Sequence, residues 1–181
     1  MNSIFRERTH DLYKASEKFQ KFYIKRVVKK HLYKYYLQSA DKHETLLIAK
    51  HHKLHKYFTI YSNDIELGRI RYNRSCTEYK LYKQHILCGI YLSKNKEIEF
   101  NISKDGIPFN LLSMFAYTTE KSNNANVKSK KNRKVFHKNS LLFNLEKIDI
   151  NRYKMEMDYP MSIMQSFALS LTIMHKYGSL L

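Results

Sequence analysis

Hydrophobic and polar residues alternate with a period of two along most of the chain, in short runs separated by turn-like stretches. The runs are LYKYYLQ (32–38), ETLLIAK (44–50), KYFTIYS (56–62), IELGRIRY (65–72), EYKLYKQ (78–84), HILCGIYL (85–92) and EIEFNIS (97–103). This period is typical of β-strands that bury one face. The segment 140–157 alternates in the same way and predicts at least two more strands. Evenly spaced short strands indicate an antiparallel barrel or sandwich, so the expected fold is mainly β.

Two segments depart from this pattern. Over residues 4–28 the apolar side chains, among them Leu12 and Phe22, lie near one side of a helical wheel. That spacing predicts an amphipathic lead-in helix within residues 1–28. In residues 118–134 Val127 is the only large aliphatic residue, which predicts a disordered basic loop. Three roles stay open for its basic part: a nuclear signal, a second lipid contact or compositional drift.

The most apolar segment lies near the C-terminal end, where no charged residue occurs between Tyr159 and Met174. It is too short and too rich in serine to span a membrane, which takes about 20 mostly apolar residues. Helix signals frame it instead. Pro160 suits a first helical turn, with Asp158 before it, and Gly178 can end the helix after the basic pair His175 and Lys176. We therefore predict a helix over residues 160–177.

This helix is apolar on nearly every side, with Ile163, Phe167 and Leu171 as its expected core residues. A helix of this kind must be buried on nearly every side. In a chain that is otherwise β, such burial is available inside a closed sheet. The predicted architecture is a closed antiparallel β-barrel with the C-terminal helix running through it.

Composition adds a partner class to this picture. The 181 residues include 43% hydrophobic ones, enough for the core of one domain. The 33 Lys and Arg residues against 16 Asp and Glu give a net charge of +17. Such an excess predicts an anionic partner: a phosphoinositide membrane, a nucleic acid or an acidic protein. Cys76 and Cys88 are expected to be free thiols of a cytoplasmic protein.

No catalytic motif is found. With four glycines the chain has no glycine-rich phosphate loop, and no hydroxyl or thiol lies in a nucleophile motif. His51, His52 and His55 cluster, but no carboxylate or cysteine nearby completes a metal-binding set. We therefore expect a protein that is not an enzyme and that uses neither a metal nor a cofactor.

Two blocks carry a resemblance to a known family. Residues 153–181, YKMEMDYPMSIMQSFALSLTIMHKYGSLL, are similar to the closing signature of the tubby-like domain, in which Met-Asp-Tyr leads through Tyr-Pro to Leu-Gln-Ala-Phe-Ala-Ile-Ala-Leu. The matching positions are Asp158, Tyr159, Pro160, Gln165, Phe167, Ala168 and Leu171. Residues 35–73 resemble the family's run of Tyr-Phe-Leu, an acidic turn, Phe-Leu-Leu-Ala, a basic cluster and Gly-Lys-Leu-Arg. The resemblance implies a short, divergent tubby-like barrel domain over residues 29–181.

The resemblance also implies a function. Tubby-like domains bind phosphatidylinositol 4,5-bisphosphate at the cytoplasmic face of the plasma membrane, and some members carry membrane-protein cargo to cilia. A chain of this kind is expected to be an adaptor in the cytoplasm, peripheral at the plasma membrane, with the nucleus and the cilium as further locations to consider. Its partners would be a phosphoinositide membrane and a membrane-protein cargo.

The head-group site is implied residue by residue. The arginine of the family's Gly-Lys-Leu-Arg motif falls on Arg71, and the preceding basic position falls on Arg69. In the basic cluster, the family's lipid-contacting lysine falls near His52 and its arginine near Leu54. The lysines that remain in this turn are Lys50, Lys53 and Lys56. Because a lysine lacks the bidentate fork of arginine, we expect weaker and less selective binding than in the family.

Two other functions remain open. Tyrosines alternate with lysines in KKHLYKYYLQ (29–38) and EYKLYKQH (78–85), as in surfaces that stack nucleic-acid bases. No nucleic-acid-binding motif accompanies them. The third reading is a degenerate scaffold that keeps the tubby fold and binds a protein partner only.

Overall fold

The computed structural model describes residues 11–14, 16–83, 86–92, 98–102, 118–121, 127–137 and 139–177. Its strands are β1 (Gln20–Lys29), β2 (Leu32–Ser39), β3 (Thr45–His52), β4 (Tyr57–Ser62), β5 (Ile65–Tyr72), β6 (Glu78–Tyr82), β7 (Ile86–Leu92), β8 (Ile98–Ile102), β9 (Thr118–Lys121), β10 (Arg133–His137), β11 (Ser140–Asp149) and β12 (Arg152–Met157). They form one antiparallel sheet in the order β8-β7-β6-β5-β4-β3-β2-β1-β12-β11-β10-β9. Helix α3 (Ile163–Lys176) follows the last strand.

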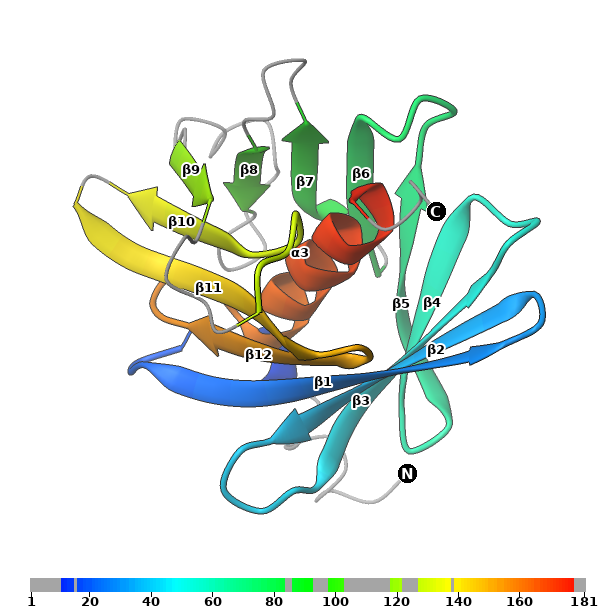
Figure 1. The fold of residues 1–181 in the computed structure, drawn as a ribbon, viewed down its shortest axis with the longest axis horizontal. Helices are drawn as coiled ribbons and strands as arrows, with labels where there is room; N and C mark the ends of the chain where they lie inside the picture. Colours follow the sequence, from blue (N-terminus) through cyan, green and yellow to red (C-terminus); the bar gives the residue numbers. More distant parts are fainter. Residues whose placement is uncertain are drawn as a thin grey trace.

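The sheet curls around α3, as Figure 1 shows. Its two edge strands, β8 and β9, come close to each other, but the strand order ends at them without a hydrogen-bonded pair joining the two edges. The mainly β fold and the enclosed C-terminal helix are therefore confirmed. Pairing of the edges, which would close the sheet into a barrel, is not observed among the described strands.

The period of two places alternate side chains on the concave and convex sides of the sheet. Buried inward residues include Phe22, Ile24, Leu37, Leu47, Ala49, Ile60, Ile70, Leu81, Ile90, Leu145 and Met155. Each of the runs from 32–38 to 97–103 contains a strand among its described residues, as predicted. The turn at 62–64 joins β4 to β5, with Asn63 and Asp64 at φ of 46° and 62°. Two consecutive residues with positive φ are what a tight hairpin turn requires.

Helix α3 begins later than predicted. Its N-cap is Ser162, whose side chain accepts a hydrogen bond from Gln165 N at 3.2 Å, while Gln165 Oε1 accepts one from Ser162 N at 3.0 Å. This capping box satisfies two backbone N–H groups that the helix leaves unpaired. Pro160 lies outside the helix, after a cis peptide bond, so its expected place in the first turn is wrong. Asp158 is also outside, and no acidic residue occupies the first turn.

The predicted burial of α3 is confirmed. Every residue from Met164 to Met174 is buried, including the core residues Phe167 and Leu171, and Ile163 is partly exposed. Two polar residues inside the helix bond to its own backbone: Ser170 Oγ donates to the Ser166 carbonyl at 2.9 Å, and Thr172 Oγ1 donates to the Ala168 carbonyl at 3.0 Å. The C-cap is Tyr177, and Gly178 lies outside the described residues. In the part of the chain that the structure describes, no helix has the length and apolarity needed to cross a membrane.

The lead-in helix predicted within residues 1–28 is wrong over its second half. Within this segment, residues 11–13 are helical and residues 20–28 belong to β1. Residues 1–10 are not described. Phe22 and Ile24 are buried as alternate residues of this strand, which pairs with both β2 and β12. The apolar residues of this segment fit a helical spacing as well as a strand, and hydrogen bonds to two neighbouring strands stabilise the strand.

The loop predicted over residues 118–134 is shorter than expected. Strand β9 occupies its first residues and β10 begins at Arg133, while residues 122–126 are not described. Strand pairing is carried by the backbone, so β9 and β10 form although aliphatic side chains are scarce. Between them, residues 127–132 form a turn that is tied to β11 by Asn132.

Candidate anion-binding site

Basic residues gather on the convex face of β2 to β5. Register places Lys34 of β2 beside Lys50 of β3, Lys50 beside Thr59 of β4, and Thr59 beside Arg69 of β5. Thr59 is 7% exposed because the long side chains on either side cover it. The sheet therefore builds a row of three cations across four strands.

At the β5 end of this row lies a surface recess of about 530 Å³. We call it the outer recess; its lining residues are Glu66, Leu67, Gly68, Arg69, Arg71, Tyr82 and Lys83. Gly68 is required for its shape, because a Cβ there would lie 2.6 Å from the Tyr82 carbonyl oxygen. The close approach of β5 and β6 at this point thus depends on a residue without a side chain.

The charges in the outer recess are unequal in availability. Arg69 Nε contacts Glu66 Oε1 at 2.6 Å, and this carboxylate raises the pKa of the guanidinium. Arg71 has no ion pair with any described residue; it lies over the Tyr82 ring at 5.6 Å. Lys83 Nζ lies 4.3 Å from the Tyr13 ring centroid. The recess thus presents two cations, Arg71 and Lys83, that each contact an aromatic ring and form no ion pair with a described residue.

The structure separates the predicted head-group residues into two sets. Arg69 and Arg71 line the outer recess. Lys50 lies two strands away, on β3, with its Nζ 4.4 Å from the Tyr61 ring centroid. The second set, Lys53 and Lys56, lies exposed at the turn between β3 and β4 and does not line the recess.

His52 also belongs to the second set. Its ring is 5.1 Å from that of His55, and its Nδ1 accepts a hydrogen bond from Leu54 N at 3.4 Å. Lys53, Lys56 and His52 therefore lie outside the recess that Arg69 and Arg71 line. Lys83 is the lining cation that the sequence analysis missed. Its signal was its position directly after β6, next to Tyr82.

His51 points the other way, into the sheet. Its ring is 4% exposed and stacks on Phe58 at 4.3 Å, and its Nε2 lies 3.0 Å from the Tyr72 hydroxyl. Burial, together with the neighbouring His175, lowers the pKa of His51 to about 4. His51 therefore adds no charge to the surface near neutral pH. No group of three or more metal-binding side chains occurs among the described residues.

His175, on the last turn of α3, has a matching environment. Its Nδ1 lies 2.8 Å from the Tyr79 hydroxyl, and its ring packs edge-on against Phe58. Burial, with a contribution from Lys176, lowers its pKa to about 4. Two neutral imidazoles are thus held in the aromatic end of the core.

Both cysteines are free thiols, as expected. Cys88 is fully buried, and this burial raises the pKa of its thiol to about 12. A thiol in this state is a small hydrophobic side chain and not a nucleophile.

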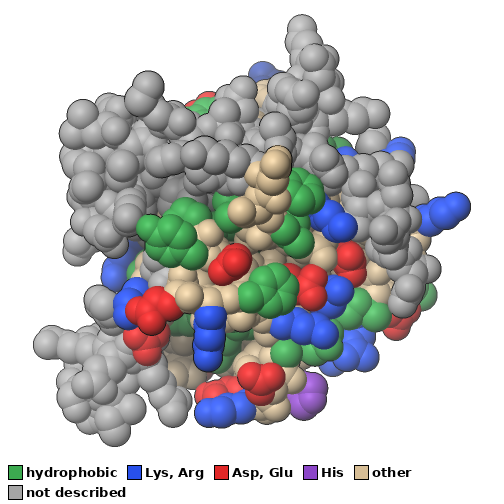
Figure 2. Space-filling model, turned by 90° about the vertical axis from the view of Figure 1, so that its left-hand side faces the viewer, with side chains coloured by type: hydrophobic (Ala, Val, Ile, Leu, Met, Phe, Trp, Pro, Cys, Tyr) green, Lys and Arg blue, Asp and Glu red, His purple; other side chains and the backbone are tan. Residues whose placement is uncertain are grey.

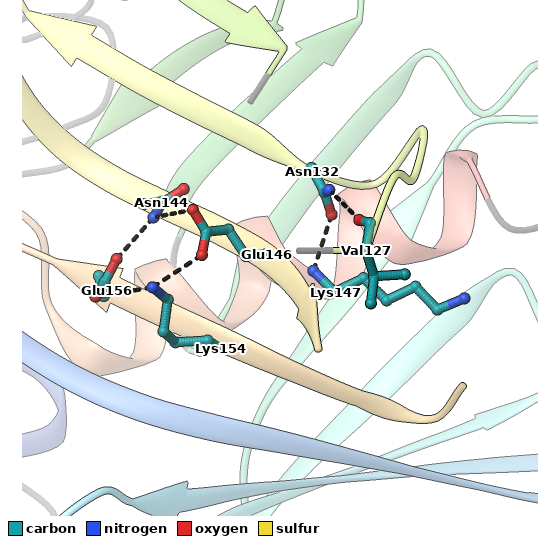
Figure 3. A network of polar contacts seen from close by, with 7 residues as sticks. All are labelled: Val127, Asn132, Asn144, Glu146, Lys147, Lys154 and Glu156. Atoms are coloured by element: carbon teal, nitrogen blue, oxygen red, sulfur yellow. Dashed lines mark hydrogen bonds and ion pairs between the residues drawn. The ribbon is translucent and has the colours of Figure 1, made fainter. Parts of the chain in front are cut away.

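The face over β11, β12 and the start of β1 differs from the recess. Figure 2 shows acidic and basic side chains next to one another there, with hydrophobic side chains between them. On the outer surface of β11 and β12, Lys154 Nζ contacts Glu146 at 2.8 Å and Glu156 at 3.3 Å, and Asn144 bridges the two carboxylates (Figure 3). This cation is neutralised within the sheet, so Lys154 offers no anion site comparable to the recess.

Comparison of the sequence with protein-family models and with curated proteins finds no match. Function must therefore be argued from the geometry of the outer recess and from the sequence resemblance.

Proposed function

We propose that the chain is a divergent tubby-like domain, with its sheet closed into a barrel, that binds phosphatidylinositol 4,5-bisphosphate as a non-enzymatic adaptor at the cytoplasmic face of a membrane. Support for the fold is the sheet that curls around a buried C-terminal helix. The observation that carries the function is the outer recess, in which Arg71 and Lys83 have no carboxylate partner among the described residues.

The chemistry of the recess suits a phosphorylated head group. Arg71 offers a planar fork for two phosphate oxygens, and Lys83 supplies a second charge that can approach a neighbouring phosphate. Arg69 forms an ion pair with Glu66, and both residues line the recess. Lys50 extends the positive surface along the row, where long-range attraction to an anionic membrane adds to binding.

The test is co-sedimentation with liposomes at near-physiological salt. Liposomes with phosphatidylinositol 4,5-bisphosphate are compared with phosphatidylserine liposomes of equal surface charge. We expect a preference for the bisphosphate that falls at least tenfold in Arg71→Gln/Lys83→Gln. The matched control is Lys25→Gln/Arg152→Gln, which removes two charges from exposed, paired positions on β1 and β12.

Equal binding to both liposomes would overturn a specific pocket and leave only the attraction of net charge. Equal losses in the two double variants would have the same meaning. An absence of lipid binding would favour the scaffold, in which the fold serves a protein partner.

One observation favours nucleic acid as a second candidate. Tyr57 and Tyr61 lie on the convex face next to Arg69 and Lys50, at 5.6 Å and 4.4 Å between ring centroid and cation. Aromatic rings interleaved with cations can stack the bases of a single strand. Binding of a labelled oligonucleotide that falls steeply with salt, and that exceeds binding to bisphosphate liposomes, would select this function.

A further inference from the structure

A second group of cations lies on the concave side of the sheet, away from the outer recess. Arg26 of β1 is paired in register with Tyr35, and Lys147 of β11 is paired with Tyr153. Both tyrosines are buried, at 4% and 0% exposure, so the partner positions also face inward. Lys131 comes from the turn before β10, and its Nζ donates to the Tyr153 hydroxyl at 3.2 Å. We call Arg26, Lys131 and Lys147 the inner basic cluster.

The backbone around the inner basic cluster is held in place. Asn132, which is fully buried, accepts a hydrogen bond from Lys147 N at 2.8 Å and donates one to the Val127 carbonyl at 2.8 Å (Figure 3). Lys131 N donates to Ser129 Oγ at 3.2 Å. The turn that carries Lys131 is thereby fixed to the strand that carries Lys147.

Arg26 is held on the other side. Its Nε donates to Asn151 Oδ1 at 3.0 Å, and its backbone N donates to the Asn151 carbonyl at 2.8 Å. The terminal nitrogens of the guanidinium make no hydrogen bond with any described residue. All three cations are therefore presented from an ordered scaffold, as a binding site requires.

No carboxylate among the described residues balances this charge. None of the three cations forms an ion pair with a described residue, although each is partly buried. In Figure 3 the side chain of Lys147 extends away from Asn132, and no contact is drawn from its Nζ. Arg133, two residues after Lys131, is not part of the cluster: its guanidinium carbon lies 4.3 Å from the Tyr177 ring centroid, and its Nη1 donates to the Asn132 carbonyl.

The electrostatics of the cluster favour the binding of an anion. Burial, with repulsion from Arg26 and Lys147, lowers the pKa of Lys131 to about 8. Burial raises the pKa of Tyr153, so its hydroxyl stays protonated near neutral pH. The hydroxyl accepts from Lys131 and keeps its own proton free for an acceptor. Three cations and a phenol donor are the complement of a compact, multiply charged oxyanion.

We propose that Arg26, Lys131 and Lys147 form an anion-binding site at the inner end of the sheet, for a phosphate group carried by a small soluble ligand or by a lipid head group. The site is separate from the outer recess and does not depend on the function proposed for it. It also gives a role to part of the basic segment 128–134 that is neither a nuclear signal nor compositional drift.

The first test uses thermal unfolding of the full chain with 10 mM pyrophosphate, against sodium chloride of equal ionic strength. We expect pyrophosphate to raise Tm by about 3 °C or more in the parent, by selective binding to the folded state. Lys131→Gln and Lys147→Gln should each remove most of this rise. The control Arg71→Gln/Lys83→Gln should keep it, because the outer recess is a different site. If one lysine variant fails to fold, the other still decides.

The second test measures proton uptake on binding by calorimetry at pH 8 in two buffers of different ionisation enthalpy. An anion beside Lys131 should raise the pKa of its ammonium group, so the parent should take up about half a proton more than Lys131→Gln, in which only pyrophosphate itself exchanges protons. A rise in Tm without proton uptake would place the anion elsewhere.

Liposomes distinguish the two sources of phosphate. Protection by pyrophosphate that depends on Lys131 identifies a site open to soluble phosphates. Bisphosphate-liposome binding that falls in Lys131→Gln, without protection by pyrophosphate, identifies a lipid head group. If neither probe distinguishes Lys131→Gln or Lys147→Gln from the parent, the proposal is overturned, whatever the outer recess binds.

Discussion

Acidification from pH 7 to pH 5 should destabilise the fold through the buried His51 and the half-buried His175. His51 and His175 have pKa values lowered from 6.5 to about 4, mainly by burial. In this window the unfolded chain binds protons at both positions and the folded chain does not. Unfolding then takes up protons, so stability falls as pH falls below 6.5 and the loss is complete near pH 4.

The magnitude follows from the two pKa values. Between pH 7 and pH 5 each histidine contributes a loss of about 2 kcal/mol, and we expect about 3 kcal/mol for the pair once solvent screening is allowed for. The charged or titratable side chains that act on the two rings are Lys176, His52 and His55, and each of them lowers the pKa. No carboxylate among the described residues opposes the effect.

The assay is urea unfolding followed by circular dichroism at pH 7, 6 and 5, with linear extrapolation to water. The double variant His175→Phe/Tyr79→Phe removes one titrating ring together with its hydrogen-bond partner, so the cost at pH 7 should be small. It should lose about half of the pH dependence. The exposed His43→Asn should lose none of it.

A parent whose unfolding free energy changes by less than about 1 kcal/mol over this range would refute the reasoning. Retention of the full dependence in the double variant would refute it equally. Either result would mean that protonated imidazole is tolerated at the aromatic end of the core.

Three substitutions test the fold and the outer recess. Phe167→Asp should prevent folding, because an unpaired charge in the core costs several kcal/mol; a thermal melt like that of the parent would contradict the buried helix. Ser162→Ala should lower the unfolding free energy by about 1 kcal/mol in urea unfolding through loss of the helix cap, whereas an unchanged value would disprove the cap's contribution. Gly68→Ala should displace the β5–β6 contact at Tyr82 and weaken bisphosphate-liposome binding, and unaltered binding would show that the recess tolerates the shift.

Much of the fold was predictable because each strand had to bury one face. The alternation of residues identified β2 to β8, β11 and β12, and the lack of charge between Tyr159 and Met174 required burial of most of α3 on every side. The start of the helix was not predictable from Pro160, since a proline can equally precede a cap; Ser162 and Gln165 carried the better signal. Strand β1 was missed because its apolar spacing also fits a helix.

The site was harder to predict, because it depends on which positions face each other across strands. Arg69 and Arg71 were identified, but Lys83 joins them only through the contact of β5 with β6. His51 and His52 are adjacent in sequence and lie on opposite faces of the sheet. The sequence already implied this, because alternate residues of a strand share a face and His51 is two residues after the buried Ala49. No spacing in the sequence brings Arg26 and Lys147 together.

The position of β1 in the sheet has a consequence for synthesis. It pairs with β12, and the helix that fills the sheet follows β12 in the chain. During translation, strands β1 to β11 leave the ribosome before their last partner and before the core that they enclose. Until α3 is made, the apolar faces of these strands have no core to pack against, so the nascent chain is prone to aggregation. Folding also depends on contacts between distant parts of the chain, which form slowly.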